Sequence, residues 1–227
     1  MKALRIAVLG ASGRMGKEIA AILGDDNSTR YVSGHDKEKP LNVLESKSVD
    51  VLIDFSLPKG FVEAVGWCVK AGKPLVSGTT GLSTKEKKML DEASKKIPIF
   101  WSANMSLGIA ILENILAQLP AEKSFDFQIE EFHHSKKKDR PSGTAILLQT
   151  ALEESQERKF PEPLSVRGGG TFGIHKIHLM GEEETLMFEH TALNRRVFAR
   201  GAVAAAKWIH KKPAGLYGMR DLLKRRV

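Results

Sequence analysis

The stretch that decides the fold is LRIAVLGASGRMGKEIAAIL, which spans residues 4–23. It begins with an apolar run over residues 4–9 that is typical of a buried strand, and it ends in a helical pattern over residues 14–23. The turn between them is rich in glycine, so the backbone can approach a phosphate group whose charge the helix N-terminus stabilises. The stretch therefore predicts the first strand and helix of a nucleotide-binding α/β sheet.

An acidic residue follows this turn at the distance expected of a dinucleotide site. Asp36 lies about 20 residues beyond Gly16, near the end of the next predicted strand, where a carboxylate accepts hydrogen bonds from a ribose. Arg14 and Lys37 are placed where a ribose 2′-phosphate would sit, although both could be ordinary surface charges. Ser12 departs from the standard fingerprint, which has its second glycine there. We therefore expect NADH or NADPH as the cofactor.

Strands and helices alternate through the first hundred residues. Ser83 and Glu86 have the capping-box spacing that opens a helix. Alternation of this kind favours parallel strands joined by right-handed crossovers, so we predict a Rossmann-like doubly wound parallel sheet. The further elements expected are strands at 31–34, 49–55, 74–77 and 97–101 and helices at 61–70 and 85–95.

The pattern changes after residue 104. A helix predicted over 107–119 precedes residues 125–132, in which apolar and polar side chains alternate as in a strand with one wet face. Because no helical pattern separates the later strands, we predict a second α+β domain built on a mixed or antiparallel sheet. The remaining elements expected are strands at 164–167, 175–180 and 185–192 and helices at 197–210 and 219–224.

Composition narrows the class of protein. The 227 residues contain one cysteine, which excludes an intramolecular disulfide and a cysteine-based zinc site, and a reducing compartment is expected. No apolar run approaches the roughly 18 residues that cross a bilayer, so we expect a soluble, intracellular protein with no membrane partner. The formal charge of +8 would attract an anion, but scattered basic residues and 7% aromatics argue against nucleic acid as the partner.

The densest group of chemically active side chains is EFHHSKKKDRPSGTA, residues 131–145. Consecutive strand residues face opposite ways, so His133 and His134 cannot readily hold one metal ion together, and we expect no metal site. The run offers a cationic loop followed by PSGT at the start of a helix, where amides and a hydroxyl are exposed. It predicts a carboxylate-binding helix end with Lys and His nearby to neutralise and protonate the ligand. A basic solvated loop capped by Ser142 is the alternative.

These motifs occur together in a known family. GASGRMG at 10–16 and HHSKKKDRPSGTA at 133–145, with DFSLP, GTTG, ANMS and VRGGGTFGIHKI between and after them, resemble the 4-hydroxy-tetrahydrodipicolinate reductases over nearly the whole chain. The resemblance implies a bacterial cytoplasmic enzyme that forms a homotetramer through the sheet of its second domain. It also implies a dinucleotide-binding domain at 1–104 plus 196–227 and a substrate-binding and oligomerisation domain at 105–195.

The resemblance further implies roles for individual residues. Gly10, Ala11, Ser12, Gly13, Arg14 and Met15 would hold the pyrophosphate of NADH or NADPH, and Asp36 would hold its ribose with Lys37 alongside. Gly78, Thr79, Thr80, Ala103, Asn104, Met105 and Ser106 would border the nicotinamide. His133 would act as proton donor or acceptor and Lys137 as proton donor, while His134, Gly143 and Thr144 would bind the substrate.

The function implied is NAD(P)H-dependent reduction of 4-hydroxy-tetrahydrodipicolinate to tetrahydrodipicolinate, in the diaminopimelate route to lysine. This substrate is a small-molecule dicarboxylate, which gives the basic composition a specific use. One alternative is a Rossmann-type NAD(P)H reductase or dehydrogenase that acts on another imine or amino acid, and the run at 133–145 argues against it. A non-enzymatic protein that binds nucleotides or nucleic acid is the other alternative.

Overall fold

The computed structural model describes residues 2–224, so Met1 and residues 225–227, at the two ends of the predicted first domain, lie outside the described range. The chain forms two compact units. The first unit contains the residues up to Met105 together with those from Arg196 onward, and the second unit is Ser106–Arg195. Within residues 2–224, no helix is both long enough and apolar enough to cross a membrane.

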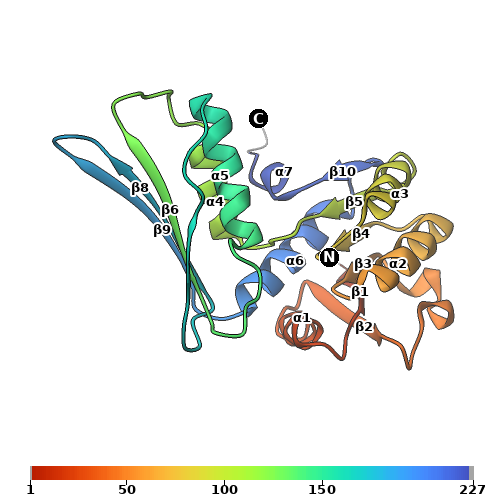
Figure 1. Cartoon of the computed structure of the whole chain (residues 1–227). Helices are drawn as coiled ribbons and strands as arrows, with labels where there is room; N and C mark the ends of the chain where they lie inside the picture. The colour runs from red at the N-terminus through yellow and green to blue at the C-terminus, as the bar shows by residue number, and fades with distance from the viewer. Residues whose placement is uncertain (1, 225–227) are drawn as a thin grey trace. The chain divides into compact units, whose positions relative to one another are not determined.

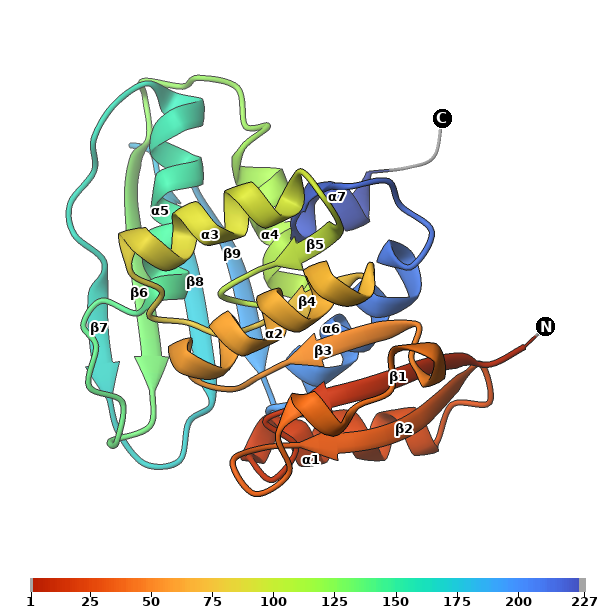
Figure 2. The ribbon, with the colours of Figure 1, turned by 90° about the vertical axis from the view of Figure 1, so that its right-hand side faces the viewer.

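The first unit is a parallel sheet with helices on both faces (Figure 1, Figure 2). Its strand order is β10-β5-β4-β3-β1-β2, and every neighbouring pair is parallel, which confirms the predicted Rossmann-like doubly wound sheet. Its strands are β1 (Leu4–Leu9), β2 (Thr29–His35), β3 (Val51–Asp54), β4 (Leu75–Ser77), β5 (Pro98–Trp101) and β10 (Gly215–Tyr217). Its helices are α1 (Arg14–Gly24) and α6 (Arg196–Ile209) on one face, α2 (Pro58–Ala71) and α3 (Thr84–Ser94) on the other, and α7 (Met219–Leu223), with short 3-10 turns η1 (Leu41–Val43) and η2 (Ser46–Ser48).

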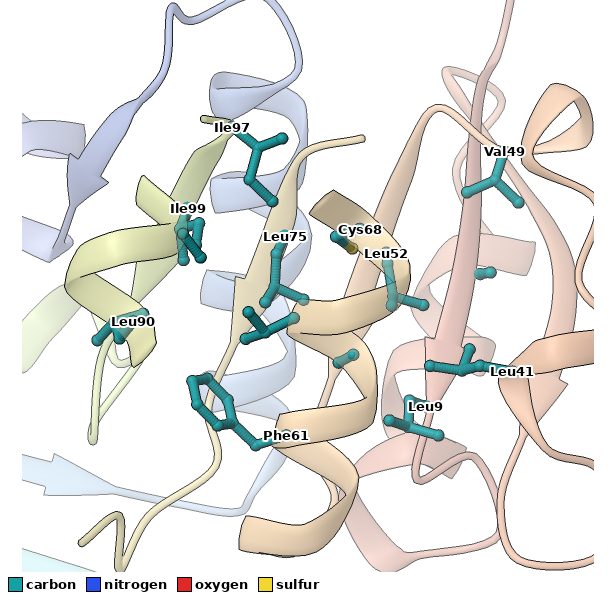
Figure 3. Close-up of a cluster of buried hydrophobic side chains, with 14 of the residues drawn as sticks. Leu9, Leu41, Val49, Leu52, Phe61, Cys68, Leu75, Leu90, Ile97 and Ile99 are labelled. Carbon is teal, nitrogen blue, oxygen red and sulfur yellow. The ribbon is translucent and has the colours of Figure 1, made fainter. Parts of the chain in front are cut away.

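The core of the first unit explains its near-continuous apolar strands. The central strand β3 is buried along its whole length, as a parallel strand covered on both faces must be. Side chains of α2, among them Phe61 and Cys68, pack against Leu52 and Leu75 of the sheet (Figure 3). Cys68 is fully buried, and burial raises the pKa of its thiol well above the usual value. It is the small core residue expected of a cysteine without a neighbouring base.

The second unit packs two helices against a mixed sheet. The strand order is β7-β6-β8-β9; β6 and β7 are parallel, and the other two pairs are antiparallel. Phe127 and Ile129 of β6 lie on the inner face, in an apolar core with helices α4 and α5. Its elements are α4 (Leu107–Leu116), β6 (Asp126–His133), α5 (Gly143–Gln156), β7 (Leu164–Arg167), β8 (Gly173–Met180) and β9 (Thr185–Ala192).

The turns η1 and η2 were not predicted, and element boundaries differ from the predicted ones by up to three residues. Two of the differences have a clear physical reason. Strand β10 was not predicted, because three residues that include a glycine are too few to show a periodic pattern. It forms through its parallel pairing with β5 at the edge of the sheet. Helix α4 ends at Leu116 rather than at 119, and Pro120 follows closely, which disfavours helical backbone in the residue before it.

Candidate active site

The glycine turn at the start of α1 is packed so closely against other backbone that two of its positions leave no space for a side chain. Gly10 adopts a left-handed conformation with φ +81°, and a Cβ there would collide with the carbonyl group of Phe55. A Cβ at Gly16 would collide with the carbonyl oxygen of Gly10 and with Ala11. The turn can therefore pack directly under the first turn of α1, which leaves backbone rather than side chains to face a ligand.

The amides at the start of α1 are available to an anion. Gly10 and Ala11 donate their N–H groups to the carbonyl of His35 at 2.9 and 3.2 Å, which fixes the turn to the end of β2. No side chain caps α1 at Gly13, and its first turn contains no acidic residue. A helix that begins in this way presents its amides and the positive end of its dipole to a phosphate. The backbone thus fits the pyrophosphate of a dinucleotide.

Asp36 is fixed beside the same turn. Its Oδ1 accepts the backbone N–H groups of Lys39 and Glu38 at 3.1 and 3.0 Å, and the side chain of Ser12 also bonds to the carboxylate. These hydrogen bonds, those from the Lys39 and Glu38 backbone first, lower the pKa of Asp36. These contacts hold the Asp36 carboxylate next to the glycine turn.

Asp54 organises the next loops at the carboxyl edge of the sheet. It is fully buried at the end of β3 and accepts hydrogen bonds from the hydroxyls of Ser77 and Thr79 at 2.7 and 2.8 Å. Ser56 donates to it as well. Burial raises the pKa of Asp54, while these three hydroxyl groups work in the opposite direction. The side chain of Thr79 therefore faces inward, whereas Thr80 is exposed and Gly78 is half-buried.

The residues at 103–106 lie at the end of the first unit and the start of the second. Ala103 is exposed and Asn104 half-buried, while Met105 and Ser106 are buried. Ser106 caps α4 by accepting the N–H of Ile109 at 3.3 Å. Their expected place beside a nicotinamide stays a prediction, as do the roles of the exposed cations Arg14 and Lys37.

The second unit contains a buried carboxylate that connects several elements. Glu131 is fully buried and accepts two hydrogen bonds from Arg167. Nη1 donates to Oε2 at 2.8 Å, and Nη2 donates to Oε1 at 2.6 Å. Its Oε1 also accepts the hydroxyl of Ser165 at 2.6 Å and the N–H of Ser142 at 3.2 Å, and its Oε2 bonds to Nδ1 of His133. Burial alone would raise the pKa of Glu131, but the donors, led by Arg167, lower it to about 2.

His133 lies at the end of β6, on the same face as Glu131. The residue is 8% exposed, and its ring contacts the ring of His175 edge to face with centroids 5.2 Å apart. Burial lowers the pKa of His133; Glu131 opposes this shift, whereas the positive charges of Lys137 and Arg167 add to it. The net shift favours the neutral imidazole.

The loop after β6 carries the predicted lysine. The ammonium group of Lys137 lies 2.9 Å from the carboxylate of Asp139 and is half-buried, whereas Lys136 and Lys138 are exposed. Asp139 also accepts a hydrogen bond from the backbone of Gly143, so a carboxylate of this chain already sits at the start of α5. The ion pair shows that Lys137 can hold a carboxylate next to the start of α5.

The start of α5 is built as predicted. Ser142 caps the helix by accepting the N–H of Ala145 at 3.2 Å, and Gly143 is exposed. Thr144 is half-buried on the same turn. Nδ1 of His134 is buried without a hydrogen-bond partner in the described part of the chain. An unpaired buried nitrogen is costly unless a ligand or water completes it.

The structure thus brings His133, Lys137 and the start of α5 into one cluster of the second unit. Sequence reasoning did not assign roles to two residues that hold this cluster together, Glu131 and Arg167. Among residues 2–224, no group of three His, Cys, Asp or Glu side chains is placed to hold a metal ion.

Burial of a third histidine predicts a dependence of stability on pH. Burial, followed by the charges of His133 and His190, lowers the pKa of His175 to about 3. The unfolded chain binds this proton near the ordinary pKa of 6.5, so unfolding takes up a proton and stability falls as the pH drops below 6.5. The free energy of unfolding should fall between pH 7 and pH 5 in both proteins. The loss should be about 2 kcal/mol larger in the wild type than in His175→Gln. Urea titrations at both pH values measure this difference, and equal losses in the two proteins would contradict it.

Comparison with known proteins identifies the family of this chain. Two family models match it, "Dihydrodipicolinate reductase, N-terminus" over residues 4–105 and "Dihydrodipicolinate reductase, C-terminus" over residues 107–223. A 4-hydroxy-tetrahydrodipicolinate reductase of Bdellovibrio bacteriovorus is 49% identical over 223 residues, which cover 98% of this chain and 97% of that protein. A protein of the same name from Xanthomonas euvesicatoria pv. vesicatoria is 38% identical over 235 residues, covering 97% of this chain and 98% of that protein.

A solved structure shows the same fold. It is a dipicolinate-bound dihydrodipicolinate reductase from Paenisporosarcina sp. TG-14, with a TM-score of 0.80 at 22% identity, covering 98% of this chain and all of that chain. The two family models together span nearly the whole chain, in the order in which its motifs occur. The resemblance seen in the sequence is confirmed: this chain belongs to the dihydrodipicolinate reductase family.

Proposed function

We propose that this chain catalyses the reduction of 4-hydroxy-tetrahydrodipicolinate to tetrahydrodipicolinate with NADH or NADPH, in the diaminopimelate route to lysine. Relatives that match nearly the whole chain are named for this reductase activity. The observation that carries the proposal is the cluster of the second unit, which brings together an imidazole, an ammonium group and a helix start, all of which would suit a carboxylate.

The first unit would hold the cofactor. The turn from Gly10 to Met15 would bind the pyrophosphate, and Asp36 with Lys37 would bind the ribose, since both the glycine conformations and the uncapped helix suit a dinucleotide. When bound, the reduced nicotinamide supplies a hydride. The residues proposed to border the nicotinamide are Gly78, Thr79, Thr80, Ala103, Asn104, Met105 and Ser106.

The second unit would bind the substrate, a ring with two carboxylates. His134, Gly143 and Thr144 would hold one carboxylate, because amides at a helix start and an unpaired buried imidazole nitrogen are both suited to an anion. The related structure from Paenisporosarcina is described as dipicolinate-bound, and dipicolinate is likewise a ring with two carboxylates. When the ligand binds, its carboxylate would replace that of Asp139 in the contacts with Lys137 and Gly143.

Two side chains are placed to manage the proton that balances hydride addition. The 4-hydroxyl group leaves as water, which gives a conjugated ring. As this ring accepts a hydride, negative charge develops on it, and a nearby acid supplies the one proton that quenches this charge. The Lys137 ammonium is one candidate donor, and His133 is a candidate donor or acceptor, because both lie in the same cluster. The positive charge of Lys137 and the polar ring of His133 also favour the binding of a doubly negative substrate beside an anionic cofactor.

A coupled assay tests this function. The product of the synthase that condenses pyruvate with aspartate semialdehyde is supplied, and the oxidation of NADH and NADPH is followed by absorbance. We expect oxidation that depends on both the synthase and this chain. Oxidation with other imines or amino-acid precursors, but none with the synthase product, would favour the alternative of a Rossmann-type reductase with a different substrate.

The chain would assemble into a homotetramer and act in the cytoplasm. The outer face of the second sheet exposes apolar side chains of three strands, and burying them against other copies would form a homotetramer. The exposed residues of this face are Leu164, Val166, Met180 and Met187. The single, buried thiol suits a cytoplasmic enzyme, where disulfides are rare.

The assembly can be disrupted by one charge. We expect the wild type to scatter light as a particle of about four times the 25.0 kDa of the chain. Met187→Lys should reduce this mass, because a buried ammonium without a partner is strongly unfavourable. Val43→Lys, at an exposed position of the first unit, is the matched control and should leave the mass unchanged. A monomeric wild type, or a tetrameric Met187→Lys, would contradict this arrangement.

A further inference from the structure

The inner face of β6 changes from apolar to charged along the strand. Phe127 and Ile129 enter the core, and the next two inward residues are Glu131 and His133. The strand register places Glu131 opposite Ser165 of β7 and His175 of β8, while His133 lies opposite Arg167. A fully buried carboxylate is costly unless it is paired and hydrogen-bonded, so its place at this end of the strand requires a reason.

The protonation of this pair follows from hydrogen-bond chemistry. A carboxylate that accepts both terminal nitrogens of Arg167 is ionised, and an ionised carboxylate can only accept hydrogen bonds. The short contact between Glu131 Oε2 and His133 Nδ1 therefore requires the proton to be on Nδ1. In a neutral imidazole this leaves Nε2 with a lone pair.

Nε2 of His133 is left without a competing contact. It has no hydrogen-bond partner among the residues that the structure describes. A Cβ at position 173 would lie 3.1 Å from this nitrogen, so Gly173 keeps the space next to it uncrowded. The charged and titratable groups that face the ring are Glu131 on β6, Arg167 on β7, His175 on β8 and Lys137 on the loop.

Arg167 determines how strongly the carboxylate acts on the imidazole. An unpaired carboxylate beside a histidine favours the imidazolium, as opposite charges do. Here Arg167 neutralises Glu131 through two hydrogen bonds, and its side chain is only 3% exposed, so the charge is weakly screened. The Nη2 of Arg167 also donates to the carbonyl of Asp139 at 2.6 Å, which ties down the loop that carries Lys137.

We infer that Glu131 is a positioning residue that fixes the Nδ1–H tautomer of His133 and so presents Nε2 as an acceptor, with Arg167 keeping the ring neutral. The inference rests on the proposed function for its catalytic meaning. In this inference Glu131 and Arg167 act through His133 and do not touch the substrate. His133 then enters the reaction as a hydrogen-bond or proton acceptor at Nε2.

Nitrogen-15 NMR of the histidine rings tests the tautomer directly. In the wild type at pH 7.5, the His133 signals, assigned by comparison with His133→Asn, should show a neutral ring protonated at Nδ1. In Glu131→Gln the amide can donate to Nδ1, so we expect the signals to move toward the Nε2–H tautomer. An imidazolium or an Nε2–H ring in the wild type would overturn the inference, whether or not the variant folds.

Kinetics supply the second readout. Glu131→Gln should lower kcat by about 10²-fold, the lower end of what one acid–base group contributes, with little change in KM for the cofactor. Arg167→Met should move the transition in the pH profile of kcat to higher pH, because the carboxylate of Glu131, no longer neutralised, favours the imidazolium form of His133. Glu153→Gln removes an ion-paired carboxylate of α5, whose partner is Lys159, and should behave as the wild type. Unchanged kcat in Glu131→Gln would refute the positioning role.

The two readouts separate this inference from the proposed function. If the wild type fails to reduce the synthase product, the proposed function is wrong, but the NMR result still decides the tautomer. If the wild type is active and the ring is not protonated at Nδ1, only the role of Glu131 is wrong.

Discussion

Lys137→Ala should lower kcat for the synthase product by about 10²-fold to 10⁴-fold, the range that a single general acid contributes. The ammonium group lies in the cluster beside His133, where negative charge would develop on the substrate ring. Cofactor binding should be unaffected, because the nucleotide turn belongs to the first unit. Steady-state kinetics with the synthase product, together with NADPH binding followed by fluorescence, measure both quantities.

The neighbouring lysines provide a matched control for charge. Lys136 and Lys138 flank Lys137 and are exposed, so each alanine variant removes one positive charge from the same loop without removing the ion pair to Asp139. Their kcat values should stay within a few-fold of the wild type, as expected for screened surface charges. Equal losses in all three variants would mean that the loop acts only by its net charge.

Gly16→Ala should weaken NADPH binding about tenfold or more and lower the free energy of unfolding by about 1–3 kcal/mol. The added methyl group would collide with the carbonyl oxygen of Gly10 and with Ala11, so the turn must move away from the start of α1. That displacement removes the amides from the position that suits a pyrophosphate. Titration with NADPH and urea unfolding measure the two effects.

Gly24→Ala is the control for this substitution. Gly24 ends the same helix, and a Cβ there meets no atom within 4 Å, so cofactor affinity should stay at the wild-type value. Normal NADPH affinity in Gly16→Ala would show that the turn is not the pyrophosphate site.

The first unit was predictable because its signals are local. A buried strand, a glycine turn and an amphipathic helix follow one another within residues 4–23, and the capping box at Ser83 and Glu86 is present in the structure. Strand β10 could not be predicted, since it depends on pairing with β5, which lies more than a hundred residues earlier in the chain. Pairing between distant segments leaves no periodic signal in a strand of three residues.

The site was predictable in part. The run at 133–145 identified His133, Lys137 and the start of α5, because these groups are close in the sequence. The pairing of Glu131 with Arg167 could not be derived in this way, since the two residues are brought together only by the parallel register of β6 and β7. One signal was present: Glu131 continues the inward alternation of Phe127 and Ile129, and a charged residue at a core position indicates a specific partner.

The pKa shifts around His133 also depend on the folded structure. The low pKa of His175, about 3, follows from burial among other imidazoles, and Glu131 owes its own low pKa to donors on β7 and to His133. Neither property can be assigned from residue type, because burial and hydrogen bonding determine the shift.

A crystal structure of the protein with NADPH and pyridine-2,6-dicarboxylate tests the central claim most directly. We expect one carboxylate of the ligand at the start of α5, in contact with Gly143 and Thr144, with Lys137 and His134 beside the ring. The ring should also be within hydrogen-bond reach of Nε2 of His133. A ligand bound away from the imidazoles and from the PSGT turn would contradict the account.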